Sequence, residues 1–135
     1  MPLVETPLEK TGQTSHNRGV LQASAMTDFL LVLSTFPTPE KAREAGRVLV
    51  GEKLAACVNI LPGLTSIYVW QDEACEDAET LVLIKTRREH YLALESRLRE
   101  LHPYETPEIV AVDIAAGLPA YLRWIADNTA RSVLV

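Results

Sequence analysis

The residues best suited to chemistry lie near the C-terminal end of the chain, in the stretch HPYETPEI at positions 102–109. A histidine, a tyrosine and two glutamates stand there, separated by two prolines. Histidine with carboxylate is typical of a metal site or of an acid–base pair. Two interpretations stay open. The stretch is either a structural corner with its tyrosine packed inward, or a polar pocket lined by His102, Tyr104, Glu105 and Glu108.

Both interpretations rest on the rigidity of this stretch. Pro103 ends the preceding helix, so we expect His102 at a helix C-terminus, where the helix dipole favours a cation. Thr106 precedes Pro107, and its backbone is therefore held extended. A rigid polar loop between two elements is a favourable place for a site.

Few other residues offer chemistry. Lys85 ends the apolar strand LVLIKT, where an isolated ammonium needs a carboxylate, an anionic ligand or solvent, and we expect it at the same end of the fold as His102. Of the other histidines, His16 lies in an N-terminal tail and His90 on the exposed side of a helix. One chain therefore leaves little room for a zinc-type site. No nucleophile–base pair or nucleotide-binding motif is visible, so we expect a protein that is not an enzyme.

Composition narrows the class of protein. The net charge is −5 and no dense basic cluster is present, which argues against nucleic acid as a partner. No apolar run approaches the length of a membrane helix, and membrane is not an expected partner either. The two cysteines do not form a disulfide framework, and a cytoplasmic protein is expected. We interpret residues 1–25 as a flexible tail and 26–135 as a single domain; the sequence leaves Met1 and Met26 open as the start.

Hydrophobic periodicity and turn residues predict the elements that position these side chains. They give the order β-α-β-β-α-β plus a terminal helix, which is the ferredoxin-like α+β fold with an extra C-terminal helix. A Pro62-Gly63 kink or bulge interrupts the second strand, and Gln71-Asp72 is a two-residue turn in a long hairpin. The predicted strands are 28–36, 55–61 continuing as 65–70, 73–86 and 107–115, and the predicted helices are 38–53, 87–102 and 120–128.

The third strand is apolar on both faces. Leu81 and Leu83 point to one face, Val82 and Ile84 to the other, and two helices can bury only one of them. A second copy of the chain is the simplest cover for the other face. The predicted turn places Cys75 opposite Tyr68, far from Cys57, so no internal disulfide is expected. Cys57 is predicted to be a small buried hydrophobe, Trp124 to be core packing, and Tyr68 and Trp70 to be interface residues.

In its motifs the chain resembles the CutA family of divalent cation tolerance proteins over residues 29–128. The motifs are EKLAACVNILPG (52–63), SIYVWQ (66–71), LIKT (83–86), HPYETPE (102–108) and YLRWI (121–125). This resemblance implies a ferredoxin-like subunit in a tight homotrimer, with the long hairpin reaching across to its neighbours. It also implies a link to copper and other divalent cations.

The copper pattern of bacterial members, carried over by position, falls on Ser34 for the cysteine and on Leu101 and His102 for the two histidines. Of these three positions only His102 keeps a side chain that binds soft metals, so we expect weak binding of Cu²⁺ or another divalent cation. A trimer could assemble that site from His102, Glu105 and Glu108 across subunits. A neighbouring pocket would contain Lys85, Tyr104 and Thr106, and the trimer interface would contain Tyr68, Trp70, Leu83 and Ile84. The alternatives are a signalling trimer like PII that binds a small anionic metabolite, and an assembly scaffold without a ligand.

Overall fold

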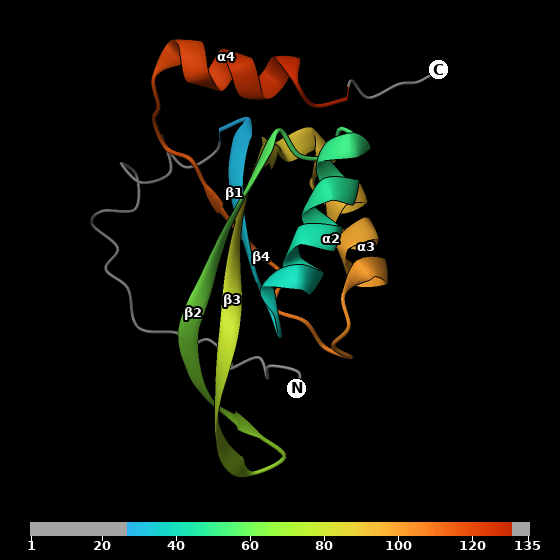
Figure 1. The fold of residues 1–135 in the computed structure, drawn as a ribbon. Helices are drawn as coiled ribbons and strands as arrows, with labels where there is room; N and C mark the ends of the chain where they lie inside the picture. Colours follow the sequence, from blue (N-terminus) through green and yellow to red (C-terminus); the bar gives the residue numbers. More distant parts are fainter. Residues whose placement is uncertain (1–26, 131–135) are drawn as a thin grey trace, which may run out of the picture.

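The computed structural model describes residues 27–130 and has the predicted β-α-β-β-α-β order followed by a further helix. The four strands form one antiparallel sheet in the order β2-β3-β1-β4, so β2 and β4 are its edges (Figure 1). The ferredoxin-like arrangement predicted from the sequence is therefore confirmed. The elements are β1 (Phe29–Phe36), α2 (Pro39–Gly51), β2 (Cys57–Trp70), β3 (Glu73–Arg87), the 3₁₀ turn η2 (Arg88–His90), α3 (Tyr91–Leu101), β4 (Val110–Asp113) and α4 (Pro119–Asp127). The predicted tail at 1–25 lies outside the described residues.

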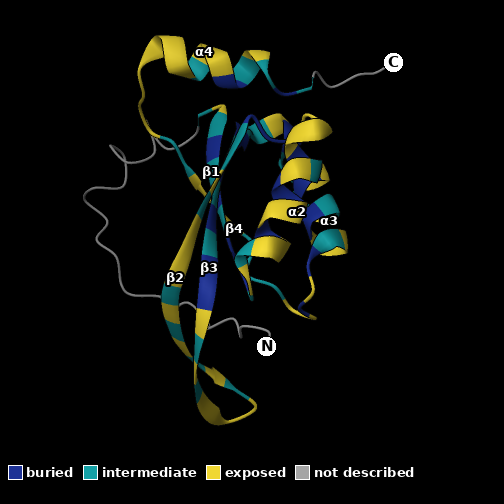
Figure 2. Cartoon of the chain, viewed as in Figure 1, coloured by how far each residue is buried: buried dark blue, intermediate teal, exposed yellow. Residues whose placement is uncertain are grey.

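The hydrophobic core lies between the sheet and the two long helices. α2 and α3 lie side by side on one face of the sheet, and their inward sides are buried while their outer sides are exposed (Figure 2). Apolar residues from both layers form a single cluster, which includes Val32, Phe36, Leu49, Val82, Ile84, Leu94 and Leu98. Burying these side chains against one another is the main stabilising contribution to the fold.

α2 begins and ends with recognisable caps. The hydroxyl of Thr38 accepts a hydrogen bond from the backbone N–H of Lys41 at 3.1 Å, and Pro39 follows it at the start of the helix, as predicted. At the other end Lys53 adopts φ +62°, and its N–H bonds to the carbonyl of Val50 while that of Leu54 bonds to Leu49. This is a Schellman motif with a lysine at the position that glycine prefers.

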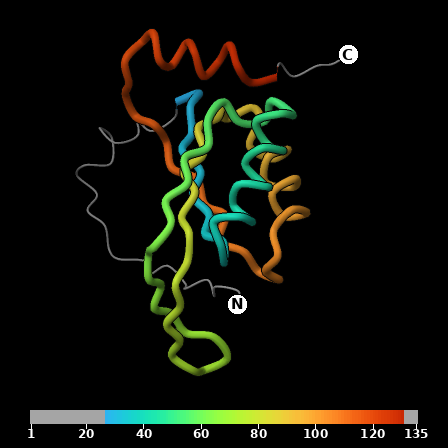
Figure 3. The backbone as a smooth tube through the Cα atoms, viewed as in Figure 1, coloured from blue at the N-terminus to red at the C-terminus, as the bar shows by residue number. Residues whose placement is uncertain are grey.

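The long hairpin was predicted in the correct register. Gln71 and Asp72 form its turn, both with positive φ, and Tyr68 lies opposite Cys75. The hairpin extends beyond the rest of the domain (Figure 3). At Pro62 and Gly63 the register shifts, so that two residues of β2 oppose one of β3 and Gly63 adopts φ +89°. The predicted interruption is thus a β-bulge, and because of it Tyr68 lies on the same face as Leu61.

The second face of the sheet is not covered by α2 or α3. The register places Leu31, Leu33, Leu83, Val110 and Val112 on this open face. Val110 and Val112 are 49% and 50% exposed. Leu83 is half-buried and remains a predicted interface residue, as do Tyr68 and Trp70. The interface role predicted for Ile84 is wrong, because Ile84 is completely buried under the helices in the subunit's own core.

Three side chains differ from their predicted environments. His90 is buried, because the chain enters α3 through a 3₁₀ turn that brings the ring inward. Trp124 is 43% exposed, since Ile125 is the buried residue of α4 and Trp124 stacks on Tyr121 instead. Cys57 is half-buried, and its sulfur lies 3.7 Å from Asn59 Oδ1 and 4.0 Å from Lys85 Nζ.

Two element boundaries also differ from prediction. α3 starts at Tyr91 rather than at 87, because Arg88–His90 form the 3₁₀ turn. β4 covers only Val110–Asp113 of the predicted 107–115, since the residues before it belong to the corner that follows α3. No helix in the described range is long and apolar enough to cross a membrane.

Candidate functional site

The ring of His102 is held by two hydrogen bonds directly after α3. Its Nε2 lies 2.8 Å from the carbonyl oxygen of Thr35, and its Nδ1 lies 3.1 Å from the backbone nitrogen of Tyr104. A carbonyl can only accept and an N–H can only donate, so the two partners assign the neutral ring with its proton on Nε2. Burial lowers the pKa of His102, and the hydrogen bond to the Thr35 carbonyl opposes this effect. The ring also stacks on Phe36, with 4.2 Å between ring centroids.

The stretch around His102 is therefore a packed structural corner. Tyr104 is 9% exposed, which confirms the interpretation that it packs inward. Both nitrogens of His102 already have partners, so binding of a cation would require one of these hydrogen bonds to break. Cation binding by His102 accordingly remains a prediction, and the corner explains the histidine without it.

Glu79 on β3 is the most unusual charged residue near the corner. It is 3% exposed, and its Oε2 accepts a hydrogen bond from the phenol of Tyr104. Its other oxygen, Oε1, is buried without a hydrogen-bond partner among the described residues. The hydroxyl of Thr35 is also buried and unpaired there. Thr35 pairs with Leu81, and Glu79 is two residues along from Leu81, so both unpaired oxygens lie on the open face of the sheet.

Glu108 supplies a second carboxylate from another part of the chain. It lies before β4 and is half-buried. Burial raises the pKa of Glu108, and the negative charge of Glu79 raises it further. The phenol of Tyr104 has a raised pKa through burial and its hydrogen bond to Glu79, so it stays a donor. We call this cluster the carboxylate site; its members are Glu79, Glu108, Tyr104 and Thr35. A positive charge at the carboxylate site would therefore stabilise its two carboxylates.

The structure does not bring the other predicted site residues to the carboxylate site. Lys85 is six positions along β3 from Glu79, about 20 Å at the rise of a strand, so the expectation of a shared end was wrong. The ammonium of Lys85 contacts Cys57 and Asn59 instead. Glu105 and Thr106 are exposed and line shallow grooves beside Arg99, of about 380 and 220 Å³. Within one chain the predicted pocket of Lys85, Tyr104 and Thr106 is therefore not formed.

The positions inherited from the copper pattern are also separated. Ser34 is completely buried on the face of the sheet that carries the helices, opposite to that of Thr35, and Leu101 is half-buried at the end of α3. In residues 27–130 no three His, Cys, Asp or Glu side chains are grouped so that they could hold a metal ion. The described part of one subunit thus offers only part of a ligand set.

Sequence reasoning missed Glu79 and Thr35. A signal for Glu79 was present, because it stands two residues before the apolar run LVLI (81–84) in the predicted third strand. A carboxylate at such a position needs a partner. No comparable signal marks Thr35, whose environment depends on how the corner folds back over the end of β1.

Comparison with known proteins gives one consistent result. A family model described as "CutA1 divalent ion tolerance protein" matches residues 30–128. The chain is similar to the divalent-cation tolerance protein CutA of Thermus thermophilus, with 54% identity over 99 residues, which are 73% of this chain and 96% of that protein. It is 45% identical over 93 residues to the Protein CutA homolog of Xenopus laevis, covering 69% of this chain but only 62% of the frog protein.

Solved structures agree with the sequence comparison. The divalent cation tolerance protein of Thermus thermophilus superimposes with a TM-score of 0.74 at 52% identity, over 76% of this chain and 99% of that one. CutA of Xylella fastidiosa gives a TM-score of 0.75 at 45% identity, over 77% of this chain and all of the other.

Proposed function

This chain belongs to the CutA1 divalent ion tolerance protein family, and we propose that it acts as a homotrimer that binds divalent cations weakly at the carboxylate site. The family model and the Thermus thermophilus relative are named for tolerance of divalent ions, not for a reaction. We propose binding rather than catalysis, in accordance with these names. We place the protein in the cytoplasm, an assignment supported by two free thiols at Cys57 and Cys75.

The open face of the sheet supports self-association. Its leucines and valines form an apolar surface that neither long helix covers, and such surfaces are typical of contacts between subunits. The exposed Trp124 and Tyr121 extend apolar surface onto α4. The long hairpin carries Ile67 and Val69, which are 74% and 56% exposed. Contact with a neighbouring subunit would bury their apolar surface. Closed symmetry then favours a small ring of identical subunits.

The unpaired Oε1 of Glu79 is the single observation that carries the cation site. A buried carboxylate oxygen without a donor is costly, and a cation would remove that cost. Glu108 adds a second carboxylate, and its pKa is raised by burial and by the negative charge of Glu79. The Thr35 hydroxyl offers a further oxygen. Because residues 27–130 hold no group of three acidic, histidine or cysteine side chains, water or a neighbouring subunit would complete the coordination.

The donor set predicts the order of affinities. A site made of oxygen ligands adds little selectivity of its own. The affinities should therefore follow the general order for divalent ions, in which Cu²⁺ exceeds Zn²⁺ and Zn²⁺ exceeds Mn²⁺. Carboxylates must be deprotonated to bind, and the raised pKa of Glu108 means that affinity should already weaken at mildly acidic pH.

Calorimetric titration of the full chain with Cu²⁺ and Zn²⁺ tests the proposal. His16 is first replaced by glutamine, since a histidine outside the described residues could bind copper by itself. Glu79→Gln and Glu108→Gln should each weaken binding about tenfold or more, because each removes a charged ligand. Glu105→Gln removes the same charge from an exposed position and should have little effect.

His102→Gln distinguishes the two ligand sets. If His102 is the ligand, this variant loses cation binding while Glu79→Gln retains it, and the carboxylate site is then wrong. Light scattering after size exclusion tests assembly independently of metal. A single species at the mass of one 15.0 kDa chain would contradict the trimer.

A further inference from the structure

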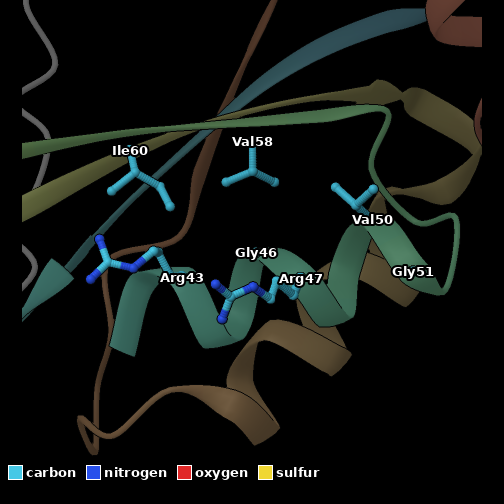
Figure 4. A pocket seen from close by; sticks show the side chains of 7 residues that line it. All are labelled: Arg43, Gly46, Arg47, Val50, Gly51, Val58 and Ile60. Atoms are coloured by element: carbon cyan, nitrogen blue, oxygen red, sulfur yellow. The ribbon is translucent and has the colours of Figure 1, made fainter. Parts of the chain in front are cut away.

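Another groove lies at the edge of the helix-covered face of the sheet, opposite to the open face. It is a groove of about 490 Å³ between α2 and the edge strand β2. Val58 and Ile60 project from β2 toward α2, and Val50 faces them from the last turn of the helix (Figure 4). Gly46 forms the helix wall, where an added Cβ would lie 3.3 Å from Val58 Cγ1. The side chains of Val58, Ile60 and Val50 therefore give the groove an apolar floor, and Gly46 lets the helix approach the strand closely.

Two guanidinium groups stand beside this floor. Arg43 and Arg47 are four residues apart on α2, so they lie on the same side of the helix, and both line the groove (Figure 4). Arg43 has one exposed partner, Glu40, at 3.4 Å. Arg47 forms no ion pair within residues 27–130.

We propose that this groove binds a small amphipathic anion, an aliphatic carboxylate, with its chain on the apolar floor and its carboxylate on Arg43 and Arg47. The volume falls in the usual range of small-molecule sites, which combine an apolar lining with a few polar anchors. Guanidinium groups match a carboxylate in both charge and geometry. Val50 is 42% exposed, so an apolar ligand would remove hydrophobic surface from water.

This site is independent of the carboxylate site. The groove uses the side of β2 that faces α2 and the surface of α2, whereas Glu79 lies on the open face of the sheet. The two sites also prefer ligands of opposite charge. Loss of binding at one therefore does not imply loss at the other.

Calorimetric titration of the full chain with decanoate tests the proposal. Decanol and acetate are the matched probes, since one lacks the charge and the other lacks the chain. The wild type should bind decanoate at least about tenfold more tightly than either probe, because only decanoate uses both parts of the groove. Equal binding of acetate would show attraction to charge alone and would overturn the proposal.

Variants locate the site. The double variant Arg43→Gln with Arg47→Gln should weaken decanoate binding about tenfold or more. The matched control, Arg99→Gln with Arg123→Gln, removes the same charge from two other helices and should bind normally. Val50→Glu should weaken binding by repelling the carboxylate, while Val50→Leu should retain it. If the two double variants bind decanoate equally, or if the wild type does not bind it, the groove is not a carboxylate site.

Discussion

Tyr104 donates the hydrogen bond of its phenol to the buried carboxylate of Glu79, and this contact links the corner after α3 to β3. The two residues are 25 positions apart and come from elements of different type. Tyr104 is also the residue whose backbone N–H fixes the ring of His102. The corner and the carboxylate site therefore share one side chain, and a change at either place should be felt at the other.

Tyr104→Phe should lower the free energy of unfolding by about 1–3 kcal/mol, because it leaves Glu79 buried with no donor to either oxygen among the described residues. Chemical denaturation measures this change. Tyr91→Phe is the matched control, since the Tyr91 phenol bonds to Glu95 at 3.0 Å on the helix surface and its loss should cost less. Equal losses for the two variants would show that the environment of Glu79 is not special. Adding Glu79→Gln to Tyr104→Phe should recover part of the loss.

Stability should fall as the pH drops below about 6.5, the ordinary pKa of histidine. Burial lowers the pKa of both His102 and His90 in the folded chain. Below pH 6.5 the unfolded chain binds protons that the folded chain does not, so the free energy of unfolding decreases until the folded pKa values are reached. The raised pKa of Glu108 acts in the opposite direction at lower pH, above its unfolded value of 4.5. Denaturation curves between pH 5 and 7, about the histidine pKa, measure this slope.

His102→Gln should make that slope shallower, because glutamine can donate to the Thr35 carbonyl without titrating. His90→Gln should remove most of the remaining slope. A wild-type slope that both variants leave unchanged would show that other groups cause it.

Leu83→Asp and Ile84→Asp are adjacent substitutions with different expected results. Leu83 lies half-buried on the open face, so its variant should fold but lose assembly, as seen by light scattering. Ile84 is completely buried in the core, so its variant should not fold, as seen by circular dichroism. A folded Leu83→Asp protein that still forms the wild-type oligomer would exclude the open face as the interface.

Lys53→Gly should raise the free energy of unfolding by about 0.5–1 kcal/mol, since glycine adopts the left-handed conformation of Lys53 without a steric cost. Glu52→Gly is the control: Glu52 has φ −89°, so glycine brings no conformational gain there, and the variant also loses the ion pair with Arg97 and should be less stable. Thermal unfolding compares the two. A stabilised Glu52→Gly variant would show that the effect does not come from the helix cap.

The parts of the fold that local sequence controls were predictable. Thr38-Pro39 gave the start of α2, and Gln71-Asp72 gave the hairpin register, because caps and two-residue turns depend on neighbouring residues. His90 and Trp124 were placed wrongly, since their burial depends on a 3₁₀ turn and on how a terminal helix docks. Neither is encoded in a short pattern.

The candidate site was less predictable than the fold. His102 and Tyr104 were identified from their spacing, but their role as a corner depends on the Thr35 carbonyl and on Glu79, which are distant in sequence. The pattern LVLIKT marks where a strand ends but not at which end of the sheet that strand end lies, so Lys85 was expected beside them. The antiparallel register places it at the far end of β3.

The bulge at Pro62 and Gly63 limits how the length of the hairpin can change. Residues beyond it alternate between faces, so deletion of one residue from β2 would exchange Ile67 and Val69 with Tyr68 and Trp70. Insertions near the tip preserve this arrangement only when each strand gains the same number of residues. Each residue of this hairpin must therefore keep its odd or even position relative to the bulge, because that position decides which face its side chain occupies. An engineered graft onto its tip should lengthen both strands equally.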